Sequence, residues 1–227
     1  SEGKQSDGSE GKQSNGSEGK QSNGSEGKQS NGSEGKKLTP GIKLNPLQIH
    51  QTDATRNYRH IRLQLHREQR YADLTVVAPQ GAQPTTVEQV HELGDAYWPL
   101  QAYRELDDAL LHLRVNEPEI GLVCIRTEGS LESVLSVDQF LAANRDHWLV
   151  REIILQMARV LRRLDLTAKS FFAIVEPGSC FAGNLVELLL ASDRSYMLMD
   201  EQNSIAVSEL NAGALPMSNG LTRVQSR

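Results

Sequence analysis

Two short, continuous apolar runs constrain the fold of this chain most, because each has the length of a strand and neither alternates with polar residues. They are IGLVCIRTEG, which begins at residue 120, and SFFAIV, at residues 170–175. Strands that are apolar on both faces are typical of parallel sheets. The two runs therefore predict neighbouring strands in the interior of a sheet.

The segments beside these runs show a helical period. Residues 97–114 place apolar side chains on one stripe, and residues 148–164 do so again after Asn144 or Asp146, either of which can cap the helix. A third, almost wholly apolar helix is expected at residues 184–191. The inward positions of the two longer helices are Leu100, Tyr103, Leu106, Leu110 and Leu113, and Ile154, Met157, Ala158, Leu161 and Leu164. Helices that alternate with buried strands indicate parallel pairing, right-handed crossovers and an α/β fold.

Shorter strands are expected before and after these elements. Residues 58–66 alternate apolar and polar side chains, as a half-buried strand does, and residues 71–78 form a second run. Residues 194–199 and 204–210 are further candidates. His60 and His66 share the polar face of the first strand, but no third ligand lies nearby in the sequence. We interpret them as solvent-facing residues and predict no metal site.

A low-complexity repeat occupies residues 1–36. One SEGKQSDG octad is followed by three copies of SEGKQSNG and a final SEGK, without any aliphatic or aromatic side chain. Such a segment cannot bury enough apolar surface to offset its chain entropy, so we expect a disordered, flexible spacer. The chain is therefore divided into a disordered octapeptide repeat at 1–36, a linker at 37–57 and one domain at 58–227.

Composition argues against several classes of protein. The chain has 24 Lys and Arg against 29 Asp and Glu, and this mildly acidic balance argues against general nucleic-acid binding. Two cysteines, Cys124 and Cys180, are too few for a disulfide framework and suit a reducing compartment. No run approaches the roughly 20 apolar residues of a membrane span, and no signal-peptide core is present. We expect a soluble, cytoplasmic protein.

The turn EPGSCFAGN, at residues 176–184, follows a buried strand and precedes a buried helix. Ligands bind at such junctions in α/β folds, because the helix amino end has unpaired N–H groups. Gly178 and Gly183 permit close backbone approach, so the turn could hold a carbonyl oxygen that gains negative charge. A tight packing turn explains the glycines equally well. We interpret Cys180 as a buried small residue rather than a nucleophile, and Glu176 as a further residue that could line the site.

Two longer motifs resemble the crotonase (enoyl-CoA hydratase/isomerase) superfamily. They are EPGSCFAGNLVELLLASDRSYM, from residue 176, and IAVSELNAGALPMSNGLTR, from residue 205. In that superfamily a Gly-rich turn precedes Glu-Leu and a helix ending in Ala-x-Asp, and a second Glu precedes a Leu-Pro-x-x-x-Gly-x-x-Arg loop. More specifically, WPLQAYRELDDALLHLR, RTEG, DHWLVREI and EPGSCFAG resemble the ring-cleaving benzoyl-CoA-dihydrodiol lyases, over residues 58–227.

This resemblance implies an α/β crotonase-like (ClpP/crotonase spiral) domain, the second half of such a lyase, incomplete at its C-terminus. The usual first oxyanion segment is replaced by VLSVDQF at residues 134–140. The implied reaction is hydrolytic carbon–carbon cleavage of 2,3-epoxybenzoyl-CoA, an acyl-CoA thioester, to 3,4-dehydroadipyl-CoA semialdehyde and formate. No metal or redox cofactor is implied. The alternative is a non-catalytic half that serves as a scaffold or dimerisation surface for a catalytic half.

The resemblance also names candidate site residues. Glu187 and Glu209 occupy the two glutamate positions and are the acid/base candidates, since paired carboxylates with separated pKa values can divide the handling of water. Gly178, Gly183 and Asn184 are the candidates for the oxyanion and substrate-binding site. The alternative for both glutamates is a structural role. Because the closing helices of the family are missing, apolar surface should be exposed, and we expect a homo-oligomer, a dimer.

Overall fold

The computed structural model describes residues 41–227, so the prediction of a disordered repeat at residues 1–36 lies outside the described residues. Seven strands form one mixed sheet in the order in which they occur along the chain. They are β1 (His50–Gln51), β2 (Thr55–Asn57), β3 (Ile61–His66), β4 (Tyr71–Val77), β5 (Leu122–Glu128), β6 (Ser170–Val175) and β7 (Arg194–Met197). Neighbours from β1 to β4 pair antiparallel, and neighbours from β4 to β7 pair parallel.

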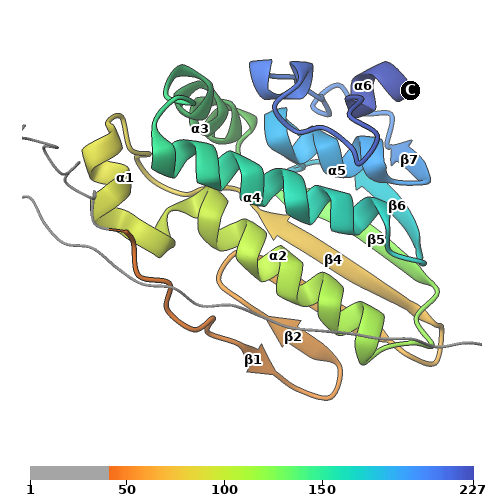
Figure 1. Cartoon of the computed structure of the whole chain (residues 1–227). Helices are drawn as coiled ribbons and strands as arrows, with labels where there is room; N and C mark the ends of the chain where they lie inside the picture. Colours follow the sequence, from red (N-terminus) through yellow and green to blue (C-terminus); the bar gives the residue numbers. More distant parts are fainter. Residues whose placement is uncertain (1–40) are drawn as a thin grey trace, which may run out of the picture. The chain divides into compact units, whose positions relative to one another are not determined.

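Helices connect the parallel strands, as the alternating pattern predicted. They are α1 (Val87–Leu93), α2 (Trp98–Val115), α3 (Leu131–Ala143), α4 (Trp148–Asp165), α5 (Val186–Ala191) and α6 (Arg223–Ser226), with 3-10 turns η1 (Gly94–Ala96), η2 (Gly183–Leu185) and η3 (Glu209–Ala212). The two long helices, α2 and α4, run side by side across one face of the sheet (Figure 1). The α/β class predicted from the sequence is confirmed.

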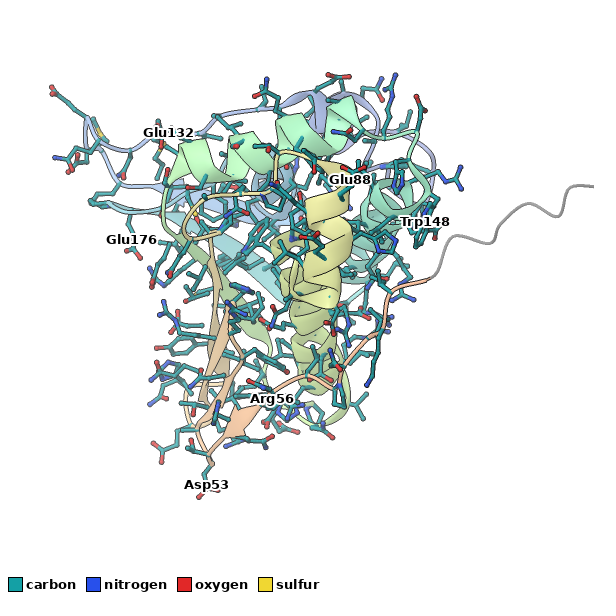
Figure 2. All side chains as sticks on the ribbon, turned by 90° about the vertical axis from the view of Figure 1, so that its left-hand side faces the viewer. Asp53, Arg56, Glu88, Glu132, Trp148 and Glu176 are labelled. Atoms are coloured by element: carbon teal, nitrogen blue, oxygen red, sulfur yellow. The ribbon has the colours of Figure 1, made fainter. Side chains whose placement is uncertain are left out.

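The core lies between the sheet and these helices. On β3 the side chains of Ile61, Leu63 and Leu65 are buried, while Arg62 and Gln64 are exposed, so the predicted alternation is confirmed. When the molecule is turned by 90°, the helices α1 and α2 lie to one side of the strands, and many side chains project from the other side (Figure 2). Among residues 41–227 we find no helix that combines the length and apolar character of a membrane span.

The start of α4 differs from the prediction in its cap. The His147 side chain, rather than Asn144 or Asp146, accepts a hydrogen bond from the Leu149 N–H, at 3.3 Å. Asn144 is unavailable because α3 extends to Ala143, and the Asn144 side chain donates to the Phe140 carbonyl at the end of α3. Residues 134–140, expected in place of the first oxyanion segment, lie within α3, which is capped by the Ser130 side chain through a hydrogen bond from the Ser133 N–H at 3.2 Å.

Two further expectations about regular structure are wrong. Residues 204–210 form no strand; a single bridge pairs Ala206 with Ala182, and η3 begins at Glu209 because the Ser208 side chain accepts from the Leu210 N–H. Residues 41–57, assigned to an irregular linker, include β1 and β2. A tight turn, in which the Thr52 N–H donates to the Thr55 carbonyl at 2.9 Å, brings these polar strands together beside β3.

Candidate functional site

The turn at residues 176–184 leaves the carboxyl end of β6, where α/β folds bind ligands. It is tied to the end of β5. The Gly129 N–H donates to the Gly178 carbonyl at 3.1 Å, and the Cys180 N–H donates to Thr127 Oγ1 at 2.9 Å. Gly178 has a φ of 87°, which favours glycine, and its own N–H has no hydrogen-bond partner among the described residues. Pro177 and Gly178 are therefore the exposed residues of the first half of the turn.

The second half of the turn is closed. The Gly183 N–H donates to the Ala206 carbonyl at 2.8 Å, and the Asn184 N–H donates to Asp138 Oδ2 at 2.7 Å. The Asn184 side-chain amide donates to the other Asp138 oxygen, and the Tyr103 hydroxyl donates to the Asn184 side-chain oxygen at 3.1 Å. The two N–H groups expected at an oxyanion site are thus both occupied within the chain in this conformation.

Asp138, on α3, is the centre of this closed half, and the sequence reasoning did not single it out. The residue is 1% exposed, and its Oδ2 also accepts from the Ser208 hydroxyl at 2.6 Å. Burial raises the pKa of Asp138 to about 6, opposed by hydrogen bonds from Ser208 and Asn184. Gly183 has a φ of 48° and leaves space for the Asp138 carboxylate, because a Cβ at position 183 would lie 2.1 Å from Asp138 Oδ2. The sequence signal that could have revealed Asp138 is its position on the same helical stripe as the apolar residues Val134, Val137 and Leu141.

Glu187, at the start of α5, is 1% exposed and has both of its oxygens occupied. Arg223 Nη1 lies 2.9 Å from Oε2, and the Asn211 amide donates to Oε1 at 2.7 Å. The guanidinium of Arg223, also 1% exposed, makes a second ion pair with Asp165. Glu187 thus belongs to a buried, fully paired cluster that connects α4, α5 and α6.

Glu209 has different surroundings. Its side chain is 70% exposed, and its Oε1 lies 3.9 Å from Arg145 Nη1. It borders a cavity of about 380 Å³ that also has Arg145 and Arg151 on its lining, with Ile154 and Leu210 among its apolar residues. Glu187 is not among the residues that line this cavity. The structure therefore places the two candidate carboxylates in separate environments, one paired in the interior and one open to solvent.

The remaining candidates near the turn are accounted for by local contacts. Glu176 is ion-paired with Arg126, which also lies 3.3 Å from Asp73. Burial raises the pKa of the Cys180 thiol to about 11, so the thiol stays protonated at neutral pH. Within residues 41–227, no group of three or more His, Cys, Asp and Glu side chains is placed to hold a metal ion.

Comparison with known proteins finds a relative that matches most of this chain. No protein-family model matches it. The chain is 42% identical over 189 residues to benzoyl-CoA-dihydrodiol lyase from Aromatoleum evansii. The match includes 82% of this chain but 34% of that protein, so the chain spans about a third of the relative's length. Over the matched residues the chain is thus similar to one segment of this lyase, as the motifs predicted.

Solved structures that resemble the chain overlap with it only partly. An enoyl-CoA hydratase from Geobacillus kaustophilus has a TM-score of 0.45 at 15% identity, over 69% of this chain and 52% of that one. An enoyl-CoA hydratase from Shewanella pealeana has a TM-score of 0.40 at 16% identity, over 60% of this chain and 46% of that one.

Proposed function

We propose that this chain forms part of a ring-cleaving enzyme that acts on 2,3-epoxybenzoyl-CoA and gives 3,4-dehydroadipyl-CoA semialdehyde and formate. The observation that supports this proposal is the 42% identity to benzoyl-CoA-dihydrodiol lyase over 189 residues. The substrate would be an acyl-CoA thioester, whose carbonyl must be polarised while carboxylates handle water. The chain would work in a cytoplasmic enzyme as part of a homo-oligomer.

In this proposal Glu209 is the acid/base group, because its carboxylate is exposed beside a cavity of about 380 Å³ with two arginines on the lining. Gly178 offers an N–H without a partner among the described residues. Gly183 and Asn184 would contribute N–H groups only after their bonds to Ala206 and Asp138 open. Glu187, the second proposed carboxylate, would likewise have to leave its present hydrogen-bonded partners before it could exchange protons.

A specific observation favours a second candidate function, a non-catalytic scaffold for another part of the same enzyme. The N–H groups of Gly183 and Asn184 and both oxygens of Glu187 are used within the chain. In this conformation the two N–H groups are not available to a substrate, because each already donates within the chain. The two candidates differ in one measurable property, since a scaffold has no saturable site for acyl-CoA.

The test has two measurements. Calorimetric titration of this chain with benzoyl-CoA should show saturable binding if it contributes to the substrate site; a flat titration favours the scaffold. In the ring-cleaving enzyme of which this chain is proposed to form part, Glu209→Gln should lower kcat about 10²-fold or more with an unchanged melting temperature, because the amide keeps the shape of the side chain and loses its basic carboxylate. Glu152→Gln is the matched control, since Glu152 is 59% exposed and lies 4.0 Å from Arg151. Normal turnover in Glu209→Gln would reject Glu209 as the base.

A further inference from the structure

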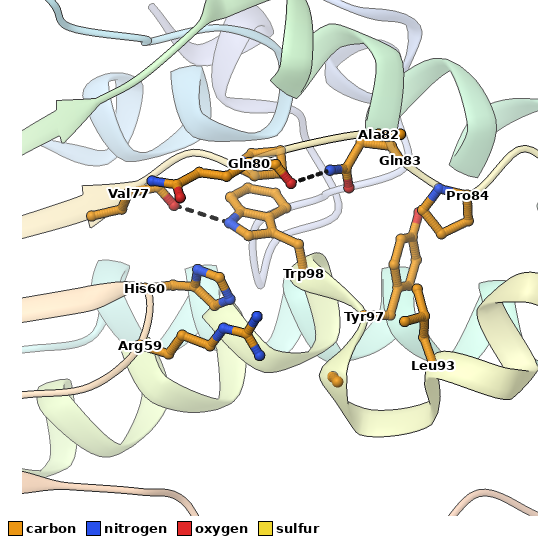
Figure 3. A pocket seen from close by; sticks show the side chains of 12 residues that line it. Arg59, His60, Val77, Gln80, Ala82, Gln83, Pro84, Leu93, Tyr97 and Trp98 are labelled. Carbon is orange, nitrogen blue, oxygen red and sulfur yellow. Dashed lines mark hydrogen bonds between the residues drawn. The ribbon is translucent and has the colours of Figure 1, made fainter.

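The polar groups around the cavity beside Trp98, of about 230 Å³, do not point to a ligand. The Trp98 indole Nε1 donates to the Val77 carbonyl at 2.9 Å (Figure 3). The Tyr97 hydroxyl has no hydrogen-bond partner among the described residues, but it is itself buried and offers no surface to the cavity. In the described part of the chain, three donors converge instead on the carboxylate of Asp138.

Asp138, on α3, is held by neutral donors. Its Oδ2 accepts from the Asn184 N–H at 2.7 Å and from the Ser208 hydroxyl at 2.6 Å, and its Oδ1 accepts from the Asn184 side-chain amide. No described Lys or Arg forms an ion pair with it. Neutral N–H and O–H groups that face one negatively charged oxygen in a buried place are the composition of an oxyanion-binding site.

The neighbouring buried carboxylate has a different partner. Glu187 is as buried as Asp138, at 1% exposed, and its Oε2 lies 2.9 Å from Arg223 Nη1. A buried charge is costly unless an opposite charge or several hydrogen bonds compensate it. Burial raises the pKa of Asp138 to about 6, so the ionised carboxylate is disfavoured here relative to an exposed one. Pairing of opposite charges explains the position of Glu187 and does not explain that of Asp138.

The backbone of the turn leaves space for an oxygen atom at this point. Gly183 has a φ of 48°, and a Cβ there would lie 2.1 Å from Asp138 Oδ2 and 3.2 Å from Ser208 Oγ. A side chain at position 183 would therefore fill the space in which the oxygen lies. The glycine and the donors together define one place for one oxygen atom.

The donors are also held in place by contacts that do not involve Asp138. The Gly183 N–H donates to the Ala206 carbonyl at 2.8 Å, and the Asn211 side-chain amide donates to the Gly183 carbonyl at 3.0 Å. Ser208 is the N-cap residue of η3, and its N–H donates to the Asn211 side-chain oxygen at 2.8 Å. The turn and η3 supply all three donors, and α3 supplies only the acceptor. Removal of the carboxylate should thus leave a preorganised set of donors.

We propose that the Asn184 N–H, the Asn184 side-chain amide and the Ser208 hydroxyl form a binding site for a carboxylate or carbonyl oxygen, and that Asp138 is its internal, autoinhibitory ligand. The site is occupied in this conformation, because Asp138 Oδ2 lies where the donors converge. An external oxygen atom binds there only when the Asp138 side chain leaves. The identification of that external group with the carbonyl of an acyl-CoA thioester rests on the proposed function, whereas the occlusion by Asp138 does not.

Chemical rescue of Asp138→Ala in the full chain tests the site. This variant lacks the carboxylate and keeps the donors, so sodium formate should bind saturably. Relative to sodium chloride at the same ionic strength, formate at ten times its Kd should raise the melting temperature of the variant by about 3 °C or more. The melting temperature of the wild-type chain should not respond, because its site is filled. Leu141→Ala is the matched control, since Leu141 is 0% exposed, lies one turn further along α3 and accepts from none of these donors.

The rescue remains measurable if Asp138→Ala does not fold in chloride. Formate should then restore the native circular dichroism spectrum of the variant, with a saturable dependence on its concentration. Equal effects of formate on Asp138→Ala and Leu141→Ala, or no effect on Asp138→Ala, would overturn the proposal.

Titration with benzoyl-CoA separates the occlusion from the proposed function. If Asp138 occludes the site, Asp138→Ala should bind benzoyl-CoA at least about tenfold more tightly than the wild-type chain, and formate should compete. If formate rescues Asp138→Ala and neither chain binds benzoyl-CoA, the oxygen-binding site stands and the acyl-CoA function fails. If both chains bind benzoyl-CoA with equal affinity, the acyl-CoA function is supported and the occlusion by Asp138 is wrong.

Discussion

Two sets of polar side chains in this molecule differ in whether they have hydrogen-bond or ion-pair partners. We call the first group the C-terminal polar network; its members are Asp138, Asp165, Asn184, Glu187, Ser208, Asn211 and Arg223, and every charged group in it has an opposite charge or a hydrogen-bond donor. By contrast, the buried Tyr97 hydroxyl, at the start of α2, has no hydrogen-bond partner among the described residues. Asn184, Glu187, Ser208, Asn211 and Arg223 of the first group lie in the two crotonase-like motifs, and Tyr97 directly precedes the WPLQAYRELDDALLHLR motif.

This difference separates structural from available polar groups. Removal of one member of a buried, hydrogen-bonded group leaves its partner unpaired, whereas removal of a group without a partner leaves no other group unpaired. The comparison therefore predicts large losses of stability from substitutions in the C-terminal polar network. For Tyr97 it predicts a small effect on stability.

The largest effect is expected for Arg223→Met. The change leaves Glu187 buried without its cation and removes one partner of Asp165, so the free energy of unfolding should fall by about 3–5 kcal/mol. Urea denaturation followed by circular dichroism measures it. Arg145→Met is the control, since its pair with Glu209 is exposed and should contribute less than about 1 kcal/mol. Similar losses in both variants would mean that the network is not the stabilising element.

A comparable but smaller loss is expected for Gly183→Ala. The new Cβ would meet Asp138 Oδ2 at 2.1 Å, in a backbone conformation that disfavours alanine, so stability should fall by about 3 kcal/mol. Gly178→Ala is a matched control, because φ is also positive there but nothing lies within 4 Å of the added carbon. It should cost about 1 kcal/mol by the same urea measurement. A harmless Gly183→Ala change would show that Asp138 does not need its present position.

The pH dependence of stability tests Asp138 itself. Because burial raises its pKa in the folded state to about 6, from an ordinary value of 3.8, the folded chain binds a proton more readily than the unfolded chain. The destabilisation is present above pH 6 and disappears as the pH falls toward 4. From pH 7.5 to pH 5 this group should add about 1 kcal/mol to the free energy of unfolding. Asp138→Asn should remove that part of the slope; an unchanged slope would contradict the assignment.

The smallest effect is expected for Tyr97→Phe. Its hydroxyl has no partner among the described residues, so removal should change the free energy of unfolding by less than about 0.5 kcal/mol. Tyr103→Phe is the counterpart in the closed region, since that hydroxyl donates to Asn184 and its loss should cost about 1 kcal/mol. Thermal melting of both variants measures the contrast. A larger loss from Tyr97→Phe than from Tyr103→Phe would reverse the comparison.

Much of the fold could be predicted because it depends on local periodicity and burial. The helices predicted at residues 97–114 and 148–164 correspond to α2 and α4. The two continuous apolar runs correspond to β5 and β6, which pair in parallel. The prediction failed where local signals were weak. The polar strand β2 is held by pairing to β3, and β1 by pairing to β2. Residues 204–210 are held by the bridge between Ala206 and Ala182 and by the Ser208 cap, and they form no strand.

The sequence by itself determined the α/β class, the long elements and, through its motifs, the relationship to the lyase. Only the tertiary structure decided which partner each candidate side chain has. Glu187 pairs with Arg223, 36 residues away in the chain, and Asp138 accepts from Asn184, 46 residues away. Periodicity records which face of an element is buried, but not which distant polar group pairs with which. For the same reason the cavity beside Trp98 was not predicted. Its residues come from the loop before β3, from β4, the 79–84 loop, α1, η1 and the start of α2, and they are adjacent only after folding.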